Sequence, residues 1–177
     1  MYPNAGNGLK VIFASQIVAI IRAILPGILG SIANAVAMVL TLLGLKQAAM
    51  DDEGYNNAFT FTIVNLVIGF FNNGSGILSS VLSAASSILS LCILYNICNA
   101  TKKLLNSAGE TSLANLGAAV WFINIMCTII LVLVRFVAWI PILNILAGIA
   151  ALLTLLAALV GAIMYLVFLS KSGNALS

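Results

Sequence analysis

The chain has 177 residues, of which 63% are hydrophobic and 6% are charged, with seven lysines and arginines against four aspartates and glutamates. Soluble domains carry about a quarter charged residues, because water must wet their surface, so this composition excludes a water-exposed fold. A lipid environment removes that requirement, and we therefore expect an all-α integral membrane protein embedded in a lipid bilayer. The net charge of +3 is too small to indicate nucleic-acid binding.

Three apolar blocks follow one another along the chain, separated by polar segments, and they hold 35, 41 and 59 residues. Since about 20 residues cross a bilayer as a helix, each block is long enough for two crossings. The blocks lack the alternating apolar–polar pattern of a membrane β-barrel. We predict one membrane domain over residues 1–177, a compact bundle of about six transmembrane helices in three tandem hairpins at about 9–46, 56–104 and 112–170.

Each block also contains a turn signal rich in glycine, proline or asparagine: Pro26-Gly27, then "NNGSG" at 72–76, then Arg135 to Pro141. The first helix, at about 9–25, has 17 residues and is short for a crossing. It would rise about 25 Å, less than the roughly 30 Å of a bilayer core. An interfacial or re-entrant first helix, giving five full crossings and separated termini, is therefore the alternative.

The distribution of charge predicts an orientation for this bundle. With three hairpins, the polar segments and both termini lie on one side, which carries five of the seven cations: Lys10, Lys46, Lys102, Lys103 and Lys171. Because lysine and arginine accumulate in short cytoplasmic loops, we expect both termini in the cytoplasm, and a bacterial-type plasma membrane.

Three of the four acidic residues form the run Asp51-Asp52-Glu53 in the second polar segment. Carboxylates are favoured at helix N-termini, where they cap free N–H groups and meet the positive end of the helix dipole. We predict a capping role, with a cation or partner site as the alternative. The run lacks the second acidic cluster that would complete a divalent-cation site.

Other chemistry is sparse in this chain. Histidine is absent, and Cys92, Cys98 and Cys127 form no CxxC pair, so they are interpreted as small packing residues. No serine-hydrolase, phosphate-loop or zinc-protease motif occurs. We expect neither an enzyme nor a bound metal or cofactor.

One amide opens each hairpin at a comparable depth. Aligning the three polar-to-apolar junctions with offsets of 49 and 59 residues superposes Gln16, Asn65 and Asn124. This alignment suggests internal repeats, although the chain has 15 asparagines and coincidence is the alternative. Each amide lies about 13.5 Å into its helix, so it should face the bundle interior rather than lipid. There it would either bond neighbouring helices together or line a substrate or ion path.

Small residues recur at four-residue spacing in the second helices of the hairpins: Ser79, Ser83 and Ser87, and likewise Ala158 and Ala162. Such spacing lets membrane helices approach closely. It is typical of tight packing, and it is compatible with a homo-oligomer or a larger membrane complex.

Two functions from different classes fit these features. The first is a membrane transport component, either a channel, a carrier or the substrate-binding subunit of a larger transporter. The second is a non-transporting structural or accessory subunit of a membrane complex. A wet cavity containing the amides would favour transport, whereas dry, mutually bonded amides would favour the accessory subunit.

Overall fold

The computed structural model describes residues 1–24, 27–71, 77–137 and 144–177, and no strand occurs in these ranges. The predicted all-α fold is confirmed. The turn signals at Pro26, at 72–76 and at Pro141 lie outside the described residues. The described helices are α1 (Pro3–Ile24), α2 (Gly27–Ala48), α3 (Glu53–Phe71), α4 (Ile77–Ser107), α5 (Thr111–Val137) and α6 (Asn144–Leu176).

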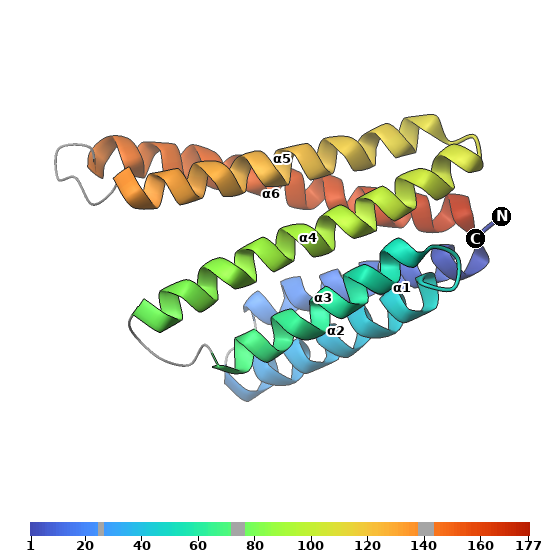
Figure 1. Ribbon diagram of the computed structural model, residues 1–177, viewed down its shortest axis with the longest axis horizontal. Helices are drawn as coiled ribbons and strands as arrows, with labels where there is room; N and C mark the ends of the chain where they lie inside the picture. Colours follow the sequence, from blue (N-terminus) through green and yellow to red (C-terminus); the bar gives the residue numbers. More distant parts are fainter. Residues whose placement is uncertain (25–26, 72–76, 138–143) are drawn as a thin grey trace.

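The six helices form a closed ring in which each packs against its neighbours in sequence, and α6 returns to pack against α1. Both termini lie at the same end of the bundle as the α2–α3 and α4–α5 connections (Figure 1). There the Tyr2 amide donates to the Leu176 carbonyl at 3.0 Å, and the Lys10 Nζ donates to the Ser177 Oγ at 2.8 Å. We call this end the polar end.

Carboxylates of the α2–α3 connection cap two different helices at the polar end. The Ala5 amide of α1 donates to the Asp51 carboxylate at 2.6 Å, and the Asn4 Nδ2 donates to it at 3.0 Å. The Gly54 amide of α3 donates to Asp52 Oδ1 at 2.7 Å. The predicted capping role is therefore confirmed for Asp51 and Asp52, with Asp51 acting across hairpins.

The helices extend further into the polar segments than the sequence predicted. α1 begins at Pro3 rather than near residue 9, and α6 continues to Leu176 rather than 170. The sequence-based bounds followed the apolar residues, whereas capping and contact between the termini allow the helical hydrogen bonds to continue through polar ends.

Five helices in the described part of the chain are long and apolar enough to cross a bilayer, which suggests a membrane protein. α1 is one of them, so the helix expected to be the weakest span has the required length. α3 is not among the five, because its first turns carry the polar residues Glu53, Asn56 and Asn57.

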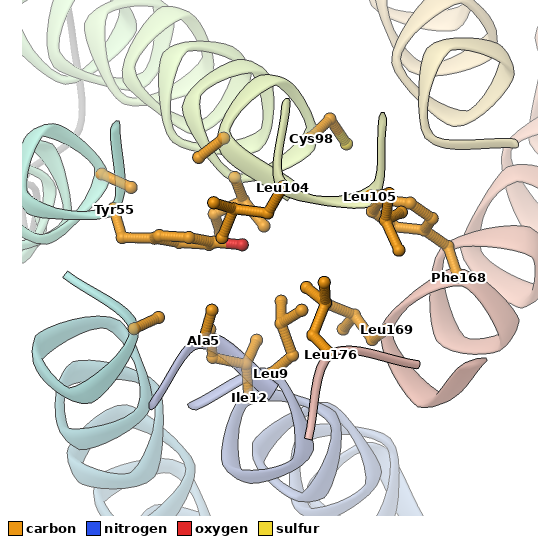
Figure 2. Close-up of a cluster of buried hydrophobic side chains, with 14 of the residues drawn as sticks. Ala5, Leu9, Ile12, Tyr55, Cys98, Leu104, Leu105, Phe168, Leu169 and Leu176 are labelled. Atoms are coloured by element: carbon orange, nitrogen blue, oxygen red, sulfur yellow. The ribbon is translucent and has the colours of Figure 1, made fainter. Parts of the chain in front are cut away.

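The buried apolar side chains gather near the polar end, where all six helices contribute to the cluster, part of which is shown in Figure 2. Leu9, Tyr55, Leu105 and Phe168 are all fully buried there. Towards the opposite end, α5 and α6 diverge from α4 (Figure 1), and Ile28 is 79% exposed. The described helices are therefore packed most closely at the polar end, and α5 and α6 separate from α4 towards the other end.

Glycines bring the helices close together at the polar end. A Cβ atom on Gly44 of α2 would lie 2.7 Å from the Gly8 carbonyl oxygen of α1, and one on Gly6 would lie 2.9 Å from the Gly173 carbonyl oxygen of α6. Only residues without side chains allow backbones to approach so closely.

The small residues singled out in the sequence lie elsewhere. Ser83 and Ala158 are half-buried, Ser87 and Ala162 are exposed, and the side chain of Ser79 is outside the described set. Their role in helix association stays a prediction.

Candidate functional site

A groove with a polar lining separates α4 from α5 and has a volume of about 300 Å³. Asn124 and Thr128 are one helical turn apart and share the face of α5 that carries the buried Val120, so the groove lies on the inner side of the bundle. We call it the inner polar groove; its lining comprises Ser87, Ser90, Leu91 and Leu94 of α4 and Asn124, Thr128 and Leu131 of α5.

The hydroxyl groups of this groove all donate their protons to carbonyls of their own helices. The acceptor is in each case the carbonyl four residues earlier, at 2.9 Å: Ser87 to Ser83, Ser90 to Ser86 and Thr128 to Asn124. A hydroxyl has only one proton to donate. The atoms left to face the groove are therefore oxygen lone pairs, which accept hydrogen bonds.

Asn124 adds a further acceptor to the lining. Its Nδ2 donates to the Val120 carbonyl at 2.8 Å, and no hydrogen bond from another described residue reaches its carboxamide oxygen. The lining is uncharged, so its acceptors match a small solute that donates hydrogen bonds.

Asn65 approaches the same helix α4 from the other side. Its Oδ1 accepts from the Ser86 Oγ at 2.6 Å, and its Nδ2 donates to the Ser90 Oγ at 3.4 Å. Ser90 also lines the inner polar groove, so it connects Asn65 to the groove that contains Asn124.

A second cavity, of about 390 Å³, lies between α2 and α3 and is lined by Asn34, Met38, Asn65 and Gly69, among others. Asn34 Oδ1 accepts a hydrogen bond from Arg22 Nη1 at 2.8 Å. Polar side chains therefore lie on four consecutive helices, α2 to α5. We call Asn34, Asn65, Ser86, Ser90, Asn124 and Thr128 the polar band.

Gln16, the third amide of the sequence alignment, lies apart from this band. It is half-buried on the face of α1 that also carries Leu9 and Ile12. Gln16 is not among the residues that line the inner polar groove. The structure thus places both Asn65 and Asn124 beside α4, whereas Gln16 lies apart from them.

Sequence reasoning missed two interhelical hydroxyl pairs. The Thr41 Oγ1 of α2 donates to the Ser15 Oγ of α1 at 2.9 Å. The Tyr55 and Thr101 hydroxyls are 2.7 Å apart in the core; because Thr101 donates to the Ile97 carbonyl, Tyr55 is the donor to Thr101. Single hydroxyls inside apolar helices were the available signal, since such groups require partners.

Comparison of the chain with protein-family models, with curated proteins and with solved structures finds no significant match. In the described ranges, no group of three or more histidine, cysteine or acidic side chains is placed to hold a metal ion.

Proposed function

We propose that this chain is a small polytopic membrane protein that serves as a component of membrane transport, with a solute site in the inner polar groove. Its three hairpins cross the bilayer six times. α3 completes the set, because it packs alongside α4 and bonds to it through Asn65. The polar end, with five of the seven cations, faces the cytoplasm.

The lining of the inner polar groove is the observation that carries this proposal. Uncompensated polar groups are costly inside a membrane, yet the groove combines three hydroxyl oxygens with the Asn124 carboxamide oxygen. The buried core separates the groove from the polar end, and the helices open towards the other side. A small solute with hydrogen-bond donors would replace water at these acceptors.

The alternative is a non-transporting accessory subunit, and the Asn65 contacts favour it. Both polar atoms of this amide bond to serines of α4, which is how a purely structural amide joins membrane helices. The three-hairpin repeat and a homo-oligomer are compatible with either function.

Water access to the groove separates the two functions. In a chain whose three cysteines are replaced by alanine, Thr128→Cys should react with a membrane-impermeant thiol reagent added outside sealed cells, because thiolate formation requires water. The matched control is Leu133→Cys on the opposite face of α5, where the native side chain is 58% exposed to lipid; it should stay unmodified. Equal protection of both cysteines would favour the accessory subunit.

Solute flux tests the lining itself. Proteoliposomes should take up at least one of methylammonium, urea and glycerol faster than protein-free liposomes, whereas acetate, which is anionic and lacks donors, should not enter faster. Asn124→Leu should reduce that uptake several-fold, because the groove loses its carboxamide oxygen. Uptake that is identical in wild type, Asn124→Leu and empty liposomes would contradict a transport role.

A further inference from the structure

A second groove lies on the outer side of the bundle, along α4 and between α3 and α5. It has a volume of about 740 Å³, and its lining includes Phe61 of α3, Ile88 and Tyr95 of α4 and Trp121 of α5. We call it the outer groove. Tyr95 and Trp121 also line a smaller adjoining cavity that contains Asn99 and Lys102.

Along this surface of α4, the side chains change from apolar to aromatic to positively charged. Ile88, Tyr95 and Lys102 are spaced by seven residues, so they lie on one face of the helix. They extend over about 21 Å of helix rise, from an apolar residue through an aromatic one to a cation. Ile88 is 62% exposed and Tyr95 is 46% exposed, so this face is turned away from the bundle interior.

An aromatic pair lies between the apolar and the charged ends of this surface. The Tyr95 and Trp121 rings meet edge to face, with their centroids 5.2 Å apart. Tyrosine and tryptophan concentrate at the boundary between acyl chains and headgroups. Lys102 is half-buried and lies about 10 Å of helix rise further towards the polar end, and a lysine so placed can extend its ammonium group to the headgroups.

We propose that the outer groove binds one anionic phospholipid from the leaflet at the polar end. Lys102 and Asn99 hold the phosphate, and an acyl chain lies along Trp121, Phe61 and Ile88. The order cation, aromatic pair, apolar groove matches headgroup, glycerol region and acyl chain. Anionic lipids are enriched in the cytoplasmic leaflet. This inference rests on the proposed membrane orientation and is independent of the transport role.

Lipid-dependent stabilisation of the purified full chain tests this site. Phosphatidylglycerol, titrated into the protein in neutral detergent, should raise the melting temperature at lower concentrations than phosphatidylcholine with the same acyl chains. Lys102→Gln should raise the half-saturating phosphatidylglycerol concentration about fivefold, the factor equivalent to the ~1 kcal/mol of one lysine near an anionic surface. Lys102→Arg should restore binding, because the charge is retained.

The matched control is Lys46→Gln, which removes an exposed cation at the polar end of α2, away from the outer groove. It should leave the phosphatidylglycerol titration unchanged. Ile88→Trp should weaken binding of both lipids, because the larger side chain occupies the acyl position.

Three results would overturn the proposal. The first is equal stabilisation of the wild type by the two lipids. The second is an equal rise in the half-saturating phosphatidylglycerol concentration in Lys102→Gln and Lys46→Gln. The third is stabilisation by inorganic phosphate alone. The last would indicate a free-anion site. A variant that melts lower without lipid is compared by its half-saturating concentration, so a folding defect does not imitate a binding defect. Labelling of Thr128→Cys in the inner polar groove is unaffected by any of these outcomes.

Discussion

Single polar residues in this chain hold helices together, and the sequence predicts their orientation better than their partners. Asn65 and Asn124 lie on inner faces, as the cost of an amide in lipid requires. The interhelical bond between Asn65 and Ser86 could not be predicted, because sequence alone does not give the rotation of one helix against the next. Asp51 is the clearest case, since its partner Ala5 is 46 residues away.

Removing the Asp51 carboxylate should destabilise the fold. Asp51→Ala leaves the Ala5 backbone amide and the Asn4 side-chain amide of α1 without their acceptor, and losing a cap of this kind typically costs about 0.5–2 kcal/mol. Glu53→Ala is the control, because Glu53 is exposed. Thermal unfolding in detergent should show a lower melting temperature for Asp51→Ala than for Glu53→Ala. Equal melting temperatures would mean that the cap contributes nothing.

The link between Asn65 and Ser86 should be measurable as a pairwise coupling. A double-mutant cycle of Asn65→Leu with Ser86→Ala should give about 0.6 kcal/mol, the average for interhelical hydrogen bonds in a membrane protein. The same cycle with Ser87→Ala should give a value near zero, because Ser87 bonds to its own helix. Equal couplings for the two serines would contradict the observed geometry.

At the level of the helices, the polar end is where close packing is achieved. Four-residue spacing predicts close packing at serines and alanines in the second helices of the second and third hairpins. A close backbone approach instead joins Gly8 to Gly44, two glycines from different helices that no spacing pattern connects. Periodicity reports which residues share a face of one helix, and it carries no information on which face of another helix lies opposite.

Filling the contact between α1 and α2 should therefore be costly. In Gly44→Ala the new Cβ atom would lie 2.7 Å from the Gly8 carbonyl oxygen and from the Ile12 Cγ1, and overpacking of this kind costs about 1–3 kcal/mol. The control is Gly69→Ala in α3, where nothing lies within 4 Å of the new atom. That variant should gain about 0.5–1 kcal/mol, because alanine favours a helix over glycine. Chemical unfolding of the two variants should move in opposite directions, and a shared direction would contradict this account.

For the whole molecule, the alternation of polar and apolar segments predicted that both termini and two connections share one end, and Figure 1 shows this arrangement. It could not predict that α5 and α6 diverge from α4, because a crossing angle depends on contacts between distant residues. Leu91 of α4 lines both the inner polar groove and the outer groove. One helix thus separates a polar inner surface from an apolar outer one.

The orientation of the whole bundle is open to direct measurement. We expect the polar end to be cytoplasmic, since moving five lysines across the membrane would oppose the charge bias that governs short loops. In a chain without native cysteines, Asn7→Cys, Glu53→Cys, Asn106→Cys and Asn174→Cys place single thiols at exposed positions of this end. All four should resist an impermeant reagent outside sealed cells and react once the membrane is permeabilised. External labelling of all four would reverse the orientation. Labelling of only some would overturn the six-crossing topology, because in that topology these four positions share one side of the membrane.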